Sequence, residues 1–202
     1  AFLSDDGGFP HRDPARTAMA LKATIYKAQI NLADMDRHVY ADIGVTIARH
    51  PSETDERMMM RLLAFALNAH EYLTFGKGLS TDDEPDLWRK DLTGAIEQWI
   101  DVGQPDEKRL RKACGRANEV VVYNYGGSGA QMWRESVRDT VSRCSNLAVH
   151  AIPMAASHAM AKLAGDGGRA MALTYTIQDG EVWVANEKDT VHVVPERMTA
   201  GA

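Results

Sequence analysis

The sequence lacks several features that mark whole classes of protein. It has only two cysteines, Cys114 and Cys144, which lie far apart and form no paired spacing, so neither a disulfide nor a zinc site is expected. We interpret both as buried thiols in a reducing compartment and expect a cytoplasmic protein. No apolar run approaches the roughly 20 residues that span a bilayer, so no membrane contact is expected.

The chain also lacks an excess of positive charge. Its formal net charge is −5, so the molecule as a whole presents no basic surface for nucleic acid. Any such contact has to come from a local patch. One candidate lies in the helix predicted after Gln104, where basic side chains surround a short apolar stripe: Lys108, Arg109, Arg111, Lys112 and Arg116.

The features that are present indicate one globular domain. The chain has 202 residues, of which 45% are hydrophobic and 25% are charged. Residues 1–18 differ from the rest, with Asp-Asp-Gly-Gly, two prolines and little periodicity, and they lack the apolar core of a secretory signal. We interpret them as a tag or disordered extension and expect residues 19–202 to form a single domain.

Strand and helix patterns interleave along this domain. Apolar patterns predict strands over 21–30, 37–48, 84–90, 95–102, 119–125, 147–152, 171–177, 182–185 and 191–194. Helices are predicted over 51–69, after 104, from the glycines at 126–129 to 143, and over 154–163. Because hairpins begin and end the chain, we predict a mixed α/β fold with a central mixed β-sheet flanked by helices.

The helix that follows Pro51 is expected to be central. Ser52 is a suitable N-cap, and acidic residues fill the first turn. From Met58 to Ala69 the sequence is apolar on almost every side, which is typical of a helix covered on most faces. We therefore interpret its three consecutive methionines as core residues rather than as a metal site.

The hairpin predicted from residues 84 to 102 contains the clearest candidate site. If its turn has two residues, Asp86 lies opposite Trp99, with Glu97 and Asp101 as diagonal neighbours about 7 Å away on the same face. Glu97 and Asp101 are about 13 Å apart along the strand, so only one of them can share an ion with Asp86. Oxygen ligands suit Mg²⁺ or Mn²⁺. The alternative is that all three acids are exposed strand and turn residues.

The segment Ile100-Asp101-Val102-Gly103-Gln104 resembles half of the PD-(D/E)xK nuclease signature. In that signature an acid and a lysine two residues later project from one strand face. The resemblance implies that the acids bind magnesium and that the lysine helps to activate water for attack on a phosphodiester. It also favours Asp101 over Glu97 as the partner of Asp86.

The lysine position of the signature is occupied by Gly103. A lysine from the next helix is expected to reach back in its place, with Lys108 as the first candidate and Lys112 as the second. The resemblance further implies that a glutamate at the start of the long helix, Glu53 or Glu56, completes the metal shell.

Longer stretches resemble the YaeQ family from Met19 to Arg197. The segments that carry the resemblance are residues 21–27, 50–57, 78–88, 99–109 and 195–197. The resemblance implies a compact restriction-endonuclease-like fold, but it implies no particular activity. Residues 1–18 lie outside it.

Two functions follow as alternatives. The first is a magnesium-dependent phosphodiesterase that acts on nucleic acid, with the basic helix guiding phosphates. The second is a binding or regulatory protein that keeps the nuclease scaffold without its chemistry and contacts nucleic acid or protein. The retained acids favour the first, whereas Gly103 and the acidic net charge favour the second.

Overall fold

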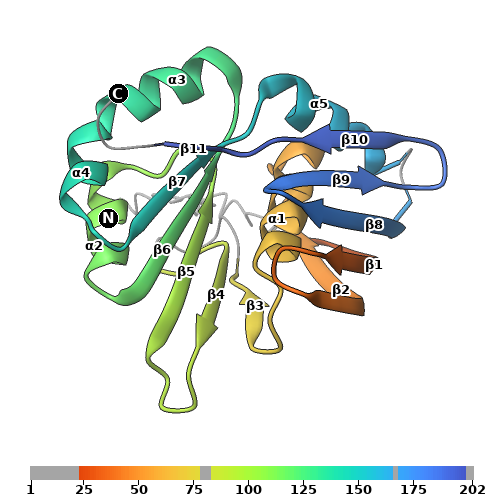
Figure 1. The fold of residues 1–202 in the computed structure, drawn as a ribbon, viewed down its shortest axis with the longest axis horizontal. Coiled ribbons are helices and arrows are strands. Elements are labelled where there is room, and N and C mark those ends of the chain that lie inside the picture. Colours follow the sequence, from red (N-terminus) through yellow and green to blue (C-terminus); the bar gives the residue numbers. More distant parts are fainter. Residues whose placement is uncertain (1–22, 78–82, 166–167, 199–202) are drawn as a thin grey trace, which may run out of the picture.

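The computed structural model describes residues 23–77, 83–165 and 168–198. Its strands are β1 (Thr24–Asp34), β2 (Val39–Arg49), β3 (Leu73–Phe75), β4 (Leu87–Lys90), β5 (Ile96–Val102), β6 (Ala117–Asn124), β7 (Leu147–Ala151), β8 (Ala170–Gln178), β9 (Glu181–Ala185), β10 (Thr190–Val193) and β11 (Glu196–Arg197). Its helices are α1 (Asp55–Leu67), α2 (Glu107–Cys114), α3 (Gly127–Ser136), α4 (Arg138–Arg143) and α5 (Met154–Leu163). Figure 1 shows their arrangement.

The strands form two mixed sheets. The first has the order β10-β9-β8-β1-β2, and the second has the order β11-β7-β6-β5-β4-β3. The predicted mixed α/β class is confirmed, but the strands are divided between two sheets where one was predicted. The reason is that the N-terminal hairpin pairs with β8 in parallel rather than with the middle strands.

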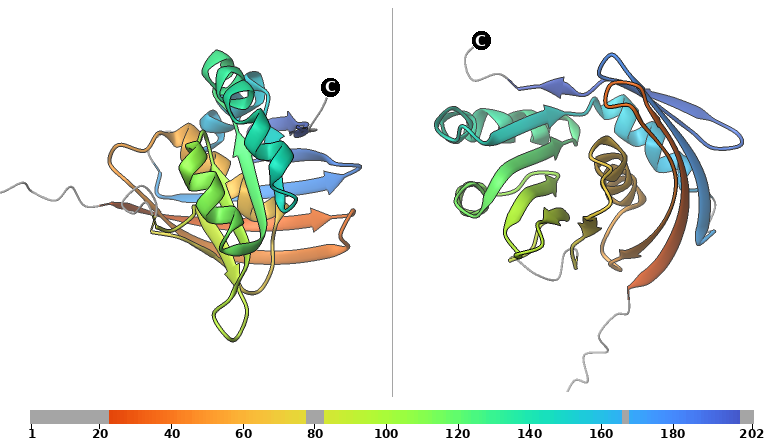
Figure 2. Two further views of the ribbon diagram at one scale, coloured as in Figure 1. Left: turned by 90° about the vertical axis from the view of Figure 1, so that its left-hand side faces the viewer. Right: turned by 60° about the horizontal axis from the view of Figure 1, so that its bottom comes forward.

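Helix α1 lies between the two sheets, as the right-hand view of Figure 2 shows. Met58, Met59 and Met60 are all fully buried, and they belong to a core shared by the inner faces of both sheets and α5. The prediction of a central helix and the interpretation of the methionines are confirmed. A helix that is apolar on every side needs this double covering, because any exposed face would leave apolar surface in water.

The start of α1 differs from the prediction. Thr54, not Ser52, is the N-cap, and its hydroxyl accepts a hydrogen bond from the amide of Arg57 at 3.2 Å. The Ser52 hydroxyl instead pairs with Nδ1 of His50 at 2.6 Å. Serine and threonine are both good N-cap residues, so the residue type does not choose between them. The path of the chain after β2 places Thr54 at the first turn of α1.

The outer face of the second sheet packs against α2 and α4. Leu110 and Ala113 from α2 and Val141 from α4 meet Trp99, Val120 and other strand residues in a second, smaller core. The helix predicted to end at 143 is interrupted at Val137, which separates α3 from α4. The outer face of the first sheet carries exposed polar side chains such as Lys27, Gln29 and Thr174, so this sheet packs on the core with one face only.

The remaining segment predictions agree with the structure to within a few residues. The N-terminal hairpin, β6, β7, α5 and the C-terminal β8–β9 hairpin are all confirmed. Strands β3 and β11 were not predicted, since three and two residues are too few to show a pattern. The expected extension over residues 1–18 lies outside the described residues. Within those that are described, no helix is long and apolar enough to cross a bilayer.

Truncation of the central helix should cost far more stability than the same change on an outer helix. We expect Met59→Ala to lower the free energy of unfolding by about 2–5 kcal/mol, because it opens a cavity between the sheets. Met132→Ala on α3 is the matched control, since that methionine is 69% exposed, and we expect a change below about 0.5 kcal/mol. Urea denaturation of both variants measures the difference, and equal effects would contradict the central position of α1.

Candidate functional site

The β4–β5 hairpin has a different register from the one predicted. Trp88 pairs with Trp99 and Leu87 pairs with Ile100, and one further step places Asp86 across from Asp101. The turn is longer than two residues, because the Asp91 carboxylate accepts hydrogen bonds from the backbone amides of residues 93 and 95, and the register shifts between residues 89 and 90. The two aspartates are therefore direct neighbours, not diagonal ones.

Asp86 is buried immediately before β4 and is held by α1. Its Oδ1 accepts a hydrogen bond from Nη2 of Arg57 at 2.6 Å and lies 3.7 Å from Nε of Arg61. Its Oδ2 accepts a hydrogen bond from the backbone amide of Val102 at 2.8 Å. Both carboxylate oxygens are thus engaged by donors from the helix and from the neighbouring strand.

Asp101 is equally buried, and it is held by α2. Arg109 donates from Nη2 to Oδ1 at 2.7 Å and from Nε to Oδ2 at 2.9 Å, a two-point pairing of guanidinium and carboxylate. The indole nitrogen of Trp99 also donates to Oδ2, at 2.9 Å. Arg109 was predicted to contact nucleic acid, but its guanidinium turns inward onto this aspartate.

Glu53 completes the cluster from the segment before α1. It is 3% exposed and lies 3.2 Å from Nη1 of Arg61, which is itself almost fully buried. It also accepts a hydrogen bond from the amide of His50, and it lies 3.8 Å from Nε of Arg57. The site therefore contains three carboxylates (Glu53, Asp86, Asp101) and three guanidiniums (Arg57, Arg61, Arg109), which we call the acid–arginine cluster.

The electrostatics of the cluster reflect its burial. Burial raises the pKa of Asp86; Arg57 opposes this shift, the charge of Asp101 adds to it, and the net direction is upward. Burial disfavours the charge on Arg57, but Asp86, Tyr125 and Glu53 more than compensate and raise its pKa. Arg57 therefore stays charged, whereas burial makes the ionised form of Asp86 less stable than it would be in water.

Arg57 lies where the nuclease signature would place its lysine. A Cβ atom added to Gly103 would lie 3.4 Å from Nη1 of Arg57, and that same Nη1 donates to the Val102 carbonyl at 2.5 Å. Gly103 has φ +105°, a conformation that L side chains rarely adopt, so a lysine there would be strained. A cation is thus present at this position, but it comes from α1.

The other predicted acids lie outside the cluster. Glu97 is part of a half-exposed ion pair with Arg89 at 2.9 Å, on the half of β5 nearer the turn. Glu56 points toward α5, where its Oε1 accepts a hydrogen bond from the Ser157 hydroxyl at 2.6 Å. Of the four acids proposed beside Asp86, only Glu53 and Asp101 join it.

The predicted lysines lie on the outer side of α2. Lys108 is exposed, and Lys112 forms an ion pair with Asp83. Together with Arg109, Asp83 and Asp106 they line an open pocket of about 380 Å³ beside the acid–arginine cluster. Two other basic residues of the patch are engaged elsewhere: Arg111 pairs with Glu107 at 2.5 Å, and the Arg116 guanidinium lies 5.6 Å from the Trp99 ring.

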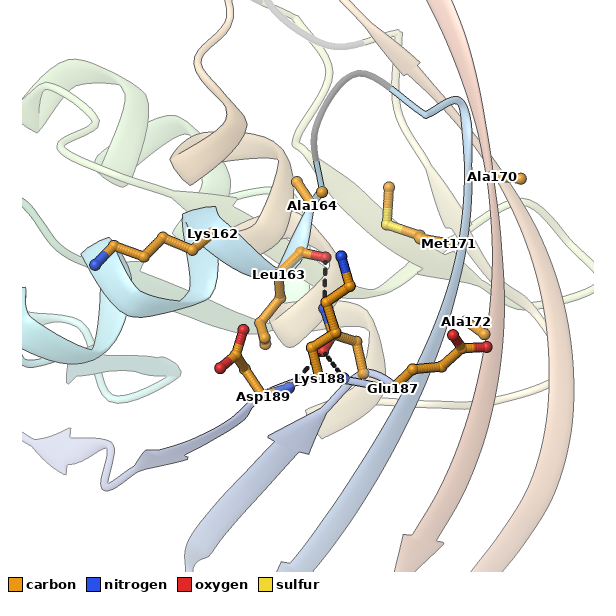
Figure 3. Close-up of a pocket in the computed structure, with 11 residues that line it drawn as sticks. Lys162, Leu163, Ala164, Ala170, Met171, Ala172, Glu187, Lys188 and Asp189 are labelled. Carbon is orange, nitrogen blue, oxygen red and sulfur yellow. Dashed lines mark hydrogen bonds between the residues drawn. The ribbon is translucent and has the colours of Figure 1, made fainter.

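A second pocket lies far from these residues. It has a volume of about 480 Å³ and is lined by the end of α5, the start of β8 and the β9–β10 turn (Figure 3). Its charged side chains balance one another, since Lys162 and Lys188 are accompanied by Glu187 and Asp189. Nothing in the sequence pointed to this pocket, and it shares no residue with the acid–arginine cluster.

The cluster, as arranged, does not fit a divalent cation. Mg²⁺ requires carboxylate oxygens with free lone pairs and usually keeps several waters, whereas Asp86 and Asp101 are each bonded to a guanidinium and to a further N–H donor. No group of three or more His, Cys, Asp or Glu side chains is placed to hold a metal anywhere in the described ranges.

Sequence reasoning missed Arg57 and Arg61. They lie one turn apart on the same side of α1, and both approach Glu53 in the segment before the helix. Arg61 also stands within an otherwise apolar stretch. A charged residue at a buried helix position requires a buried counter-ion. The position of Arg61 in the apolar run could therefore have predicted its pairing with an acid.

Comparison with known proteins gives one consistent result. A family model described as "YaeQ protein" matches residues 19–195. The YaeQ protein of Escherichia coli K12 is 44% identical over 175 residues, covering 87% of this chain and 95% of that protein. The chain belongs to the YaeQ family. The Salmonella typhi YaeQ protein is similarly close, with 42% identity over 175 residues.

Two crystal structures of YaeQ proteins have the same fold. The protein from Xanthomonas axonopodis pv. citri superposes with a TM-score of 0.83 and 47% identity, covering 89% of this chain and 99% of that one. The protein from Pseudomonas syringae gives 0.81 and 38%, covering 89% and 97%. The two-sheet arrangement is therefore shared by YaeQ proteins, and the predicted family is confirmed.

Removing one negative charge from β5 should lower stability more in the acid–arginine cluster than in the Arg89–Glu97 pair on the same strand. We expect Asp101→Asn to lower the free energy of unfolding by about 3 kcal/mol, because it breaks the two-point pairing of the buried carboxylate with Arg109. Glu97→Gln removes the same charge from β5 at the half-exposed Arg89 pair and should cost less than about 1 kcal/mol. Chemical denaturation distinguishes the two, and a small effect of Asp101→Asn would mean that the Arg109 pair is solvated.

The pH dependence of stability tests the state of Asp86. A raised pKa means that the folded chain binds the proton more tightly than the unfolded chain, so this group's contribution to stability falls as pH rises from about 4 through its folded pKa. Asp86→Asn removes this dependence. The stability of the wild type relative to this variant should therefore decrease between about pH 4 and pH 7, measured by urea unfolding at a series of pH values. An increase would mean that Arg57 and Arg61 outweigh burial.

Proposed function

We propose that this YaeQ protein is a nucleic-acid-binding module that uses a nuclease-like scaffold without metal-dependent cleavage. One observation carries the proposal: the acids expected to bind magnesium are each neutralised by an arginine. In a metal-dependent hydrolase such acids keep free oxygens for the ion. Here the donors of Arg57 and Arg109 take those oxygens.

The energetics favour the same conclusion. The three carboxylates and Arg61 are almost fully buried, and Arg57 and Arg109 are largely buried. Breaking a buried pair of guanidinium and carboxylate costs several kcal/mol. A magnesium ion would have to displace two such pairs at once. The acid–arginine cluster is thus better suited to holding α1 and α2 against the hairpin than to exchanging ligands during turnover.

The pocket on α2 supports a role in binding phosphates. Lys108 and Lys112 project at its wall beside Arg109, and Lys108 has no ion-pair partner among the described residues. Phosphate oxygens of a polynucleotide would displace Asp83 from Lys112 and so gain two ammonium contacts. Such contacts position a backbone without reading its sequence. We place this function in the cytoplasm, in keeping with the free cysteines.

A magnesium-dependent phosphodiesterase is the second candidate, and Arg57 is the observation that favours it. Its guanidinium supplies a cation at the lysine position of the nuclease signature, next to two aspartates on paired strands. This function requires that Arg57 and Arg109 both leave their carboxylates when a metal and a substrate bind.

Binding and cleavage assays separate the two candidates. We expect single- or double-stranded oligonucleotides to bind at low salt, with Lys108→Ala and Lys112→Ala each weakening binding about five-fold and reducing the salt dependence by about one ion. Lys188→Ala, which removes a lysine from the distant pocket, is the matched control and should leave affinity unchanged. Fluorescence anisotropy against salt concentration measures these effects.

The same samples decide whether metal chemistry occurs. We expect no heat of binding when magnesium or manganese is titrated into the wild-type protein, and no cleavage of the oligonucleotides in their presence. Metal binding that disappears in the Asp86→Asn and Asp101→Asn variants, together with cleavage, would establish the phosphodiesterase instead. Affinity that does not respond to either lysine would reject the α2 pocket.

A further inference from the structure

Two thiols that are distant in the sequence are neighbours in the fold. Cys114 is the last residue of α2, and Cys144 follows the last residue of α4. The two helices lie side by side on the outer face of the second sheet (Figure 1). Both cysteines are partly exposed and pack on the edge of the same small core, rather than being buried as the sequence suggested.

Hydrogen bonds hold the two helix ends together around these thiols. Asn146, two residues after Cys144, donates from Nδ2 to the carbonyl oxygen of Cys114 at 3.0 Å and to that of Ala117 at 2.9 Å. One turn earlier, the Thr140 hydroxyl donates to the Glu107 carboxylate at 2.6 Å. The two elements are therefore fixed to each other on both sides of the cysteine pair.

Cys144 also affects the protonation of Cys114. The pKa of Cys114 is raised to about 12 by burial and by a side-chain hydrogen bond with Cys144. A thiol that keeps its proton is a poor nucleophile, so Cys114 is the weaker first attacker of the pair. Cys114 nevertheless lies beside Cys144 where the ends of α2 and α4 meet, which is where a second, resolving thiol has to be.

We propose that Cys114 and Cys144 form a reversible oxidation site that closes to an intramolecular disulfide by exchange with a small-molecule disulfide. This inference is independent of nucleic-acid binding. Intracellular disulfides are usually transient and responsive to oxidants rather than structural. A partly exposed pair of adjacent thiols, held by flanking hydrogen bonds, has the arrangement that such a site needs.

The exchange balances in two steps. The Cys144 thiolate, after losing its proton to water, attacks one sulfur of the small disulfide; a sulfur–sulfur bond forms to Cys144 and the other half leaves as a thiolate. Cys114 then loses its proton and attacks the Cys144 sulfur, which releases the second half. The protein loses two electrons and two protons, and the small disulfide is reduced to two thiols.

The position of the pair gives the reaction a structural consequence. Helix α2 also carries Arg109, whose guanidinium holds Asp101, and Lys108 and Lys112, which line the neighbouring pocket. A covalent bond from the end of α2 to the end of α4 would fix the helix on which these residues lie. The oxidised form would thus restrict movement of α2 relative to the second sheet.

Exposure of the native protein to oxidised glutathione tests the site. We expect the wild type to lose both free thiols without retaining glutathione, its intact mass to fall by that of two hydrogen atoms, and non-reduced peptide mapping to link residues 114 and 144. The protein should remain unchanged in size on a column. A reducing agent should restore both thiols.

Single substitutions provide the matched controls. In Cys114→Ser, Cys144 should accumulate as a stable glutathione adduct, because no thiol remains to resolve it. Thermal unfolding shows whether each variant is folded. If either is not, the peptide map of the wild type still shows whether residues 114 and 144 become linked. Stable glutathione adducts on the wild type, a disulfide between two copies, or two unreacted thiols would each overturn the proposal.

Discussion

The apolar surface of α1 on every side is the constraint on which the rest of the structure depends. A helix without a polar face cannot lie on one sheet, because its far side would remain in water. The fold meets this demand with two sheets that cover α1 from both sides, with α5 closing part of the gap. The division of the strands, the long N-terminal hairpin and its pairing with β8 all serve that covering.

The charged start of α1 follows from the same burial. Arg57 and Arg61 enter the space between the sheets with the apolar helix, so their charges need partners there, and Asp86 and Glu53 provide them. Buried pairs of this kind contribute little net stability relative to apolar residues, but they specify which groups must meet. In this protein they determine how the hairpin, the helix and the segment before it are joined.

The sequence predicted the fold more successfully than the site. Period-two patterns and the apolar run from Met58 to Ala69 locate nearly all of the longer elements, because the buried face of a strand or helix appears in the sequence as regularly spaced apolar residues. The hairpin register was wrong, because Asp91 closes a longer turn than the sequence pattern distinguishes. Glu53, Asp86 and Asp101 were found as acids, but their arginine partners were not.

The positions of Arg109 and of the two cysteines were mispredicted for the same physical reason. An arginine is usually exposed, and so pattern analysis assigned Arg109 to the surface, although its two-point bond to Asp101 turns it inward. Likewise, the separation of Cys114 and Cys144 along the chain contains no information about the packing of α2 against α4. Contacts between side chains on different elements depend on tertiary structure, which a single sequence encodes only indirectly.

The parallel pairing of β1 with β8 also has a consequence for biosynthesis. Lys27 lies beside Ala170 and Asp34 beside Ile177, so the central pair of the first sheet joins segments from nearly opposite ends of the chain. A ribosome produces the N-terminal hairpin and α1 long before β8 emerges, and during that interval a mostly apolar helix and one edge of β1 are uncovered. The nascent chain is therefore expected to depend on chaperones until its last strands are complete, and premature termination before Ala170 would yield a product suited to degradation rather than to folding.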